Sequence, residues 1–215
     1  MCGLYTKNST STKLNPTFTF SLSEWVLVMK IDLGAQALKK LQKINGDKRF
    51  DFLGFVLNLK ESELTDNLDK LSRDVDLGLI QTIGTLLIHY SEEKLAPLSG
   101  KLVKFKDLPG GYAYEGAFIK RAIQPIEYVF GGNIESLLKA AELLGGFKLG
   151  FADASVQIVA LKNIPLTYIL YGAGEFTASA NILYDESASY QLPTEDLAVL
   201  GEITTMRLIQ AKEMI

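Results

Sequence analysis

The sequence predicts an α+β fold in which a mostly antiparallel sheet packs against several helices, the last of them long. Two apolar or β-branched runs of strand length, residues 156–160 and 164–170, follow each other across a short polar connection, which favours paired strands. A third short run at residues 181–184 is placed to pair with them. Apolar residues at helical spacing mark further segments on both sides of these runs, and they predict the helices that cover the sheet.

The chain is predicted to form one α+β domain over residues 29–215, preceded by a mobile arm over residues 1–28. Its 215 residues, 47% of them hydrophobic, are enough for one core but cramped for two full domains. Residues 5–23 are rich in Ser, Thr and Asn and show little periodicity, which is typical of a loosely attached segment. Met29 is an alternative start of translation.

Three segments in the first half of the domain have a regular pattern. Residues 32–45 are predicted to form a helix that ends at Gly46, because their apolar residues recur at helical spacing. Residues 50–59 are rich in Phe, Val and Leu and are predicted to form a strand. Residues 74–90 are predicted to form a central helix, and the residues of its apolar face are Leu79, Ile80, Ile83, Leu87 and Tyr90.

The middle of the chain is predicted to contain one strand and two helices. Residues 101–105 alternate as a short strand, which a Gly-rich turn follows. Residues 112–130 are apolar at helical spacing, and Pro125 is expected to end or kink that helix. Residues 134–144 form an amphipathic helix that ends at two glycines. Neither a P-loop nor a dinucleotide-binding fingerprint occurs at the glycine pairs, so turns and caps explain them.

The last third of the domain contains the strongest strand signals and the last helix. Pro165 has no N–H to donate, so it is expected at the first position of its strand or on a sheet edge. Residues 171–176 are a Gly-rich break where the backbone can approach another group closely. Residues 194–213 are predicted to form the last helix, with Thr194 as its N-cap. Two acids follow in its first turn, where the helix dipole favours negative charge.

The charge balance and the hydropathy argue against nucleic-acid and membrane partners. A formal net charge of −3, from 22 basic and 25 acidic residues, leaves no positive excess to attract a phosphate backbone or anionic lipids. No apolar run approaches the roughly 20 residues that a membrane-spanning helix needs. The apolar residues 25–29 are too few for the core of a signal peptide. The predicted location is therefore cytoplasmic.

A single cysteine and a single histidine exclude an intrachain disulfide framework, a Cys/His zinc site and a self-contained iron–sulfur cluster. Cys2 followed by Gly3 is similar to the N-terminal nucleophile of glutamine amidotransferases, but the Ser/Thr-rich arm offers none of the motifs that such enzymes need downstream. We interpret Cys2 as part of an ordinary start of translation. His89 is a candidate general base or ligand, but the helix dipole or a buried hydrogen bond explains its place at a helix end better.

A series of short motifs runs in a fixed order from about Leu79 to Ile209. The motifs are Ile88-His89-Tyr90, Leu108-Pro109-Gly110-Gly111, Arg121, Ala141 with Leu143, Gly145-Gly146, Asp153-Ala154-Ser155, Ile164-Pro165, Glu175-Phe176, Ile182-Leu183-Tyr184-Asp185 and Leu192-Pro193-Thr194-Glu195-Asp196. This series resembles the family called domain of unknown function 3786. The resemblance implies anaerobic archaea or bacteria as the source, and some family members carry a separate cysteine-rich iron–sulfur module that this sequence lacks. It implies no catalytic residues, because no activity is established for the family.

The sequence departs from the family pattern in the Gly-rich break. The family usually has an aromatic residue followed by Gly-Asp-Glu-Glu-Phe, whereas residues 171–176 are Tyr-Gly-Ala-Gly-Glu-Phe and lack two of the carboxylates. Hard cations need several oxygen ligands, so the change weakens any cation site there. We therefore predict no metal, and the sequence identifies no other cofactor.

The leading functional hypothesis is a noncatalytic ligand-binding or interaction domain associated with anaerobic metabolism. Polar residues beside glycine breaks in an apolar, strand-rich region predict its pocket, and the predicted ligand-binding residues are Arg121, Asp153, Tyr171, Glu175 and Asp185. A competing hypothesis is an enzyme that uses His89, or the acidic group of Glu175, Asp185 and Glu195, for acid–base chemistry. A third is a scaffold that docks on a redox or one-carbon enzyme. The predicted partners are thus a small-molecule ligand or such a protein.

Overall fold

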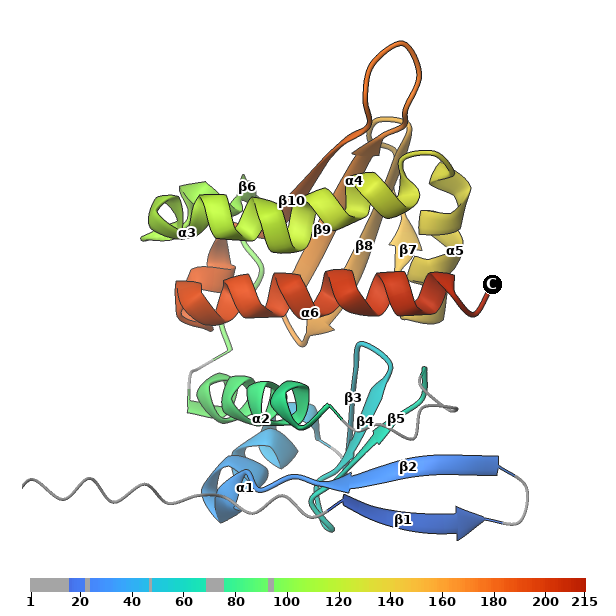
Figure 1. Cartoon of the computed structure of the whole chain (residues 1–215). Helices are drawn as coiled ribbons and strands as arrows, with labels where there is room; N and C mark the ends of the chain where they lie inside the picture. Colours follow the sequence, from blue (N-terminus) through green and yellow to red (C-terminus); the bar gives the residue numbers. More distant parts are fainter. Residues whose placement is uncertain (1–15, 22–23, 47, 69–75, 93–94) are drawn as a thin grey trace, which may run out of the picture.

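The computed structural model describes residues 16–21, 24–46, 48–68, 76–92 and 95–215. The fold is α+β, as predicted, with two five-stranded antiparallel sheets in the described parts of the chain. In Figure 1 the lower half contains the strands β1–β5 with the helices α1 and α2, and the upper half contains β6–β10 with α3–α6. The sequence did not indicate that the strands divide into two sheets.

The N-terminal sheet has the strand order β1-β2-β5-β4-β3. Its strands are β1 (Pro16–Ser21), β2 (Glu24–Lys30), β3 (Arg49–Phe52), β4 (Phe55–Asn58) and β5 (Glu63–Asp66). The prediction of one strand over residues 50–59 is wrong, because this stretch folds back on itself as the β3–β4 hairpin. Leu53 and Gly54 form its turn with φ angles of 49° and 78°, a left-handed conformation that glycine adopts without steric cost.

Strand β1 and the start of β2 fall within residues 1–28, for which the sequence predicts an arm. The two strands pair with each other, and β2 also pairs with β5 through Val28, Met29 and Lys30. Met29 is buried at this junction. Cys2 lies outside the described residues.

Helices α1 (Gly34–Asn45) and α2 (Leu77–Glu92) pack against each other in the same half of the molecule. Helix α1 ends at Gly46 as predicted, with the Gly46 N–H donated to the Gln42 carbonyl and φ at 75°. Helix α2 buries most of its predicted apolar face, and the buried residues are Ile80, Ile83, Leu87 and Tyr90.

The C-terminal sheet has the strand order β6-β10-β9-β8-β7. Its strands are β6 (Leu102–Lys104), β7 (Phe147–Lys148), β8 (Ala154–Leu161), β9 (Ile164–Tyr171) and β10 (Ser179–Asp185). The predicted tight pair is the β8–β9 hairpin, in which Asn163 takes φ of 62° at the turn. The predicted third strand is β10, which pairs with β9.

Pro165 occupies the second position of β9, a central strand, so its expected place at a strand start or a sheet edge is wrong. Strand β10 pairs with β9 only as far as Leu166, and Pro165 lies past the end of that ladder. On the other side, the β8–β9 ladder is irregular between Val159 and Leu161, next to Pro165. The missing proline N–H therefore falls where neither ladder is regular.

One continuous helical run crosses a face of the C-terminal sheet (Figure 1). It consists of α3 (Gly111–Phe118), the π-helical turn η2 (Ile119–Ile123) and α4 (Gln124–Phe130), and α5 (Ile134–Leu143) follows it. Pro125 does not end the run. A proline cannot donate to the carbonyl four residues before it, and the π-helical departure from α-helical geometry ends two residues before Pro125.

Helix α6 (Thr194–Lys212) crosses the C-terminal sheet beside the α3–η2–α4 run, on the side nearer to the N-terminal half of the molecule (Figure 1). The hydroxyl of Tyr184 on β10 donates to the Leu197 carbonyl of α6 at 2.8 Å. The predicted N-cap is wrong by one residue, because Pro193 holds that position and no side chain caps the helix. Thr194 instead donates its hydroxyl to the Pro109 carbonyl at 2.6 Å, which ties the start of α6 to the turn before α3.

Candidate functional site

A cavity of about 210 Å³ lies where the helical run α3–η2–α4 covers the edge of β10. Strand β6 pairs with β10 only at Leu183, Tyr184 and Asp185, so it covers only the second half of that edge. The chain leaves β6 through the short 3-10 turn η1 (Phe105–Asp107). The cavity forms between this turn, the helical run and residues 180–182 of β10.

The apolar wall of the cavity comes from three elements. Phe105 of η1 and Phe118 of α3 are buried and stack with their ring centroids 4.2 Å apart. Ile119 and Ile123, the first and last residues of η2, also line the cavity, as does Ile182 of β10. Turns of π-helix are rare in proteins overall, but where they occur they are often at functional sites. A cavity lined by one is therefore a candidate binding site.

Five polar residues complete the lining, and they are Lys104, Lys106, Glu115, Glu127 and Asn181. Lys106 Nζ lies 3.8 Å from Glu115 Oε1. Glu127 Oε1 accepts the Ala180 N–H at 2.9 Å, which satisfies a backbone group on the half of the β10 edge that β6 leaves uncovered. Within the described residues, the Lys104 ammonium, the Asn181 amide and Glu127 Oε2 have no hydrogen-bond or ion-pair partner.

The first turn of α6 binds polar residues from two other helices. Asp196 Oδ2 lies 2.7 Å from Nδ1 of His89 on α2, and Glu195 Oε1 accepts the hydroxyl of Tyr114 on α3 at 2.7 Å. The hydrogen bond between Tyr114 and Glu195 raises the pKa of the phenol and lowers the pKa of the carboxyl. The side chains of His89 and Asp196 are 43% and 14% exposed. The sequence indicates Asp196 only as an acid in the first helical turn, where the helix dipole favours it, and it gives no signal of the contact with His89.

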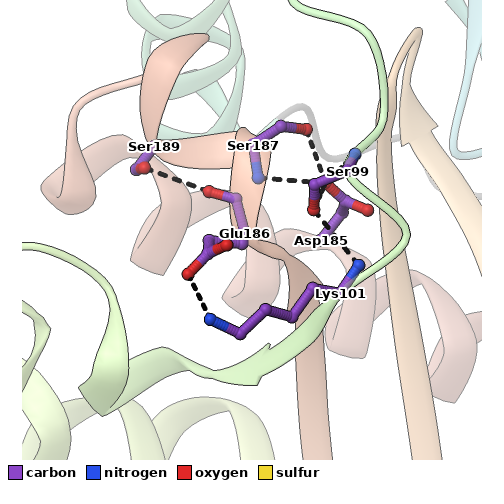
Figure 2. A network of polar contacts seen from close by, with 6 residues as sticks. All are labelled: Ser99, Lys101, Asp185, Glu186, Ser187 and Ser189. Carbon is purple, nitrogen blue, oxygen red and sulfur yellow. Dashed lines mark hydrogen bonds and ion pairs between the residues drawn. The ribbon is translucent and has the colours of Figure 1, made fainter.

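Asp185, a predicted ligand-binding residue, ends β10 and is 3% exposed. Figure 2 shows it beside Ser99, which precedes β6, and Ser187 of the 3-10 turn η3 (Glu186–Tyr190). Its Oδ1 accepts the N–H and the hydroxyl of Ser99 at 2.9 and 2.8 Å, and those of Ser187 at 2.9 and 2.6 Å. Its Oδ2 accepts the Gly100 N–H at 2.7 Å. The carboxylate thus joins η3 to the chain that leads into β6.

Two opposing effects act on the pKa of Asp185. Burial raises the pKa of this carboxyl, but the hydrogen bonds from Ser187 and Ser99 outweigh burial and hold the pKa well below its ordinary value. An ion pair of 2.6 Å between Lys101 and Glu186 lies next to this network (Figure 2). The network stabilises a chain junction, because the carboxylate directs its hydrogen bonds to the protein itself.

The structure divides the other four predicted ligand-binding residues between one end of the C-terminal sheet and the helical run. Tyr171 is half-exposed at the end of β9, next to Asp153, whose Oδ2 accepts the backbone N–H of the residue after Tyr171 at 2.9 Å. Glu175 is exposed in the connection between β9 and β10. Arg121 lies on η2 with its side chain 66% exposed, and its Nη1 is 3.5 Å from Glu202 Oε1 on α6.

Asp153 and Tyr171 are therefore brought together, with Glu175 in the loop that leads from this end of β9 into β10. Asp185 lies at the other end of β10 from the loop that holds Glu175. The seven extended residues of β10 separate the two ends of the strand by about 20 Å. Arg121 makes its ion pair within the helical layer. None of the five lines the cavity at the β10 edge. A single pocket that they share stays a prediction.

The cavity was missed because its residues come from stretches with ordinary strand and helix patterns. Lys104 alternates with Phe105 as in any half-buried strand, and Glu127 lies among apolar residues at helical spacing. Pro125 was the one available signal, since a proline inside a helical pattern predicts an irregularity, and η2 ends two residues before it.

Within the ranges that the structure describes, no three His, Cys, Asp or Glu side chains gather in a group that could hold a metal ion. Among the helices in those ranges, none combines the length and the apolar character required to cross a bilayer.

A family model described as "Domain of unknown function (DUF3786)" matches residues 55–207, more than half of the 215-residue chain. The match extends from β4 in the N-terminal sheet to α6, so it includes parts of both sheets and every residue of the cavity lining. No curated protein and no solved structure matches the chain.

Proposed function

The chain belongs to the family described as a domain of unknown function (DUF3786), and from the cavity at the β10 edge we propose that it is a noncatalytic domain that binds a small molecule. One observation carries the proposal: an apolar wall and two polar side chains without partners in the described residues, Lys104 and Asn181, line the same cavity. Small-molecule sites are mostly apolar, with a few polar groups that orient the ligand.

The composition of the lining supports binding over catalysis. The residues that line the cavity include no His, the most frequent general base, and no Cys, Ser, Thr or Tyr. Its two acids already make contacts to the protein, Glu115 to Lys106 and Glu127 to the Ala180 N–H. Binding needs only that Lys104 and Asn181 receive polar groups of the ligand.

A cavity-filling variant tests the proposal. Ile119→Trp enlarges a side chain in the π-helical wall, and Ile134→Trp makes the same change at a half-buried isoleucine of α5 that does not line the cavity. The thermal midpoint Tm of each variant and of the wild type is measured with a panel of amino acids, carboxylic acids, amines, sugars and nucleosides. A ligand that binds the folded state raises Tm in proportion to the logarithm of its concentration over Kd.

We expect at least one compound class to raise the Tm of the wild type and of Ile134→Trp, but not that of Ile119→Trp. If no class shifts the wild type, or if Ile119→Trp responds as the wild type does, the cavity is not a binding site.

A second candidate function is acid–base catalysis at His89, favoured by its 2.7 Å contact with Asp196. A carboxylate on one ring nitrogen orients an imidazole and leaves the other nitrogen for proton transfer. Acid–base catalysis by the acidic group of Glu175, Asp185 and Glu195 is less favoured. Asp185 accepts hydrogen bonds from two serines, and Glu195 accepts one from Tyr114.

The catalytic candidate is tested by incubating the protein with a mixture of metabolites and following each by mass spectrometry. Any conversion should be lost in His89→Gln and reduced in Asp196→Asn, while Tyr114→Phe, which changes the neighbouring pair only, should retain it. Conversion that persists in His89→Gln would rule out this role for the histidine.

A redox or one-carbon enzyme as protein partner, an anaerobic setting and a cytoplasmic location are further parts of the proposal, supported by the family resemblance and the composition. The partner is tested by affinity purification of the tagged protein from an anaerobic host, with Ile119→Trp as a parallel bait. Recovery of the same redox or one-carbon enzyme in repeated purifications supports it, and its absence counts against it.

A further inference from the structure

We infer that the ligand of the β10-edge cavity is a free α-amino acid with an apolar side chain, an inference that rests on the proposed binding function. Lys104 receives its carboxylate, Glu127 receives its ammonium group, and Phe118, Ile119 and Ile123 contact its side chain. The juxtaposition behind this inference is one unpartnered cation, one carboxylate with a free oxygen and an apolar wall around a single small cavity.

The charges of the lining define the ligand's charges. The cavity is lined by two lysines and two glutamates, and Lys106 and Glu115 lie 3.8 Å apart as one pair. Lys104 has no ion-pair partner among the described residues, so it does not pair with Glu127 across the cavity. One positive and one negative group therefore remain, which is the complement of a zwitterion.

Ligands of one sign fit this lining less well. A phosphate ester would bring its two negative charges close to Glu115 and Glu127, and like charges in a partly enclosed site repel strongly. A simple amine would leave Lys104 without a counter-charge, and a simple acid would leave Glu127 with one oxygen unsatisfied. Charged groups that lose water without gaining a partner weaken binding.

Glu127 is preorganised to accept an ammonium group. The Ala180 N–H holds its Oε1 at 2.9 Å, so the carboxylate is oriented before a ligand arrives while Oε2 has no partner in the described residues. Groups that are already oriented lose little conformational freedom on binding. Lys104 lies on a different wall, at the end of β6, whereas Glu127 is on α4.

The remaining lining matches an aliphatic side chain. The stacked rings of Phe105 and Phe118 are buried, and the two isoleucines of η2 extend this apolar surface. A cavity of about 210 Å³ has room for an amino acid. Burial of a leucine-sized side chain against this wall is expected to supply much of the affinity.

The inference is tested with four small probes: leucine, isocaproate, which lacks the ammonium group, isoamylamine, which lacks the carboxylate, and glycine, which lacks the side chain. Each is titrated into the full-length protein while backbone amide chemical shifts are followed by NMR. We expect leucine to shift the amide signals of residues 180–182 and of η2. Isocaproate and isoamylamine, which each lack one charged group, should bind with about tenfold lower affinity, and glycine should cause no shift.

Variants assign the charges. Lys104→Met should lower the affinity for leucine and for isocaproate about tenfold and leave the affinity for isoamylamine unchanged. Glu127→Gln keeps an acceptor for the Ala180 N–H, and it should lower the affinity for leucine and isoamylamine but not for isocaproate. Lys148→Met is the matched control, because Lys148 is an exposed lysine on β7 at the opposite edge of the sheet.

Two results overturn the inference and separate its failure from that of the proposed function. If isocaproate or isoamylamine shifts the same amides with the affinity of leucine, the cavity binds small molecules but not as zwitterions. If none of the four probes shifts them, the amino-acid assignment is wrong, and the broader Tm panel with Ile119→Trp decides whether the cavity binds another class.

Discussion

Arg207 on α6 and Asp66 on β5, 141 positions apart in the chain, form a buried ion pair with two hydrogen bonds of 2.7 and 2.5 Å. Arg207 is fully buried, its Nε donates to the Leu53 carbonyl at 2.8 Å, and its guanidinium carbon lies 4.0 Å from the centroid of the Phe55 ring. The arginine thus bonds to the β3–β4 turn and to β5 at once. It joins the last helix to the N-terminal sheet.

Replacing Arg207 with methionine should lower the free energy of unfolding by about 3–5 kcal/mol, because it leaves Asp66 as a buried charge without its bidentate partner. The matched control is Arg121→Met, which removes an exposed arginine 3.5 Å from Glu202 and should change the free energy by less than about 1 kcal/mol. Urea unfolding monitored by circular dichroism measures both. Equal changes in the free energy of unfolding for the two substitutions would show that burial does not increase the contribution of the ion pair of Arg207 to stability.

Asp185→Asn should destabilise the protein at neutral pH by about 1.5–3 kcal/mol, because an amide replaces a carboxylate that accepts five hydrogen bonds. The folded-state pKa of Asp185 lies below its unfolded value, so its stabilisation is fully present above the unfolded pKa of about 3.9 and is lost as pH falls towards the folded pKa. The stability gap between wild type and variant should therefore narrow below about pH 4.

Asp107→Asn is the control for Asp185, because Asp107 is exposed and makes no such network. Chemical unfolding at a series of pH values gives the comparison. A gap for Asp185→Asn that stays constant down to the lowest pH would contradict the assigned direction of the pKa shift.

Gly201→Ala should destabilise the protein by about 1–3 kcal/mol through overpacking under α6. A Cβ at this position would lie 2.5 Å from the Tyr184 hydroxyl and 2.6 Å from a ring carbon of Phe118, both of which are buried. Gly116→Ala in the exposed part of α3 meets nothing within 4 Å and should stabilise the helix by up to about 1 kcal/mol. Thermal unfolding of the two variants should therefore move Tm in opposite directions, and a shift in the same direction would refute the packing argument.

The contact between His89 and Asp196 should appear as a coupling free energy of about 0.5–1 kcal/mol in a double-mutant cycle of His89→Gln and Asp196→Asn. The value is modest because the histidine side chain is 43% exposed and water screens the interaction. A second cycle of His89→Gln with Glu195→Gln, whose carboxylate is bonded to Tyr114, should show weaker coupling. Stronger coupling in the second cycle would show that His89 interacts with Glu195 rather than with Asp196.

Much of the secondary structure followed from the chain's local pattern. The β8–β9 hairpin, α5 and α6 form where apolar periodicity and turn residues indicated them, and α1 ends at Gly46 as predicted. These features depend on the backbone preferences of neighbouring residues, which the sequence displays directly. The errors at residues 50–59, Pro165 and Thr194 arose where turn geometry or the extent of a neighbouring ladder decided the outcome.

The sequence by itself thus determined the α+β class and most helices and strands of the described chain, because periodicity and capping act over a few residues. Only the tertiary structure decided that the strands divide into two sheets, that Arg207 is buried against Asp66, and that Lys104 and Glu127 line one cavity. The physical reason is that burial and ion pairing depend on which distant segments meet. An arginine on a helix has the same local pattern whether it faces water or a carboxylate 141 residues away.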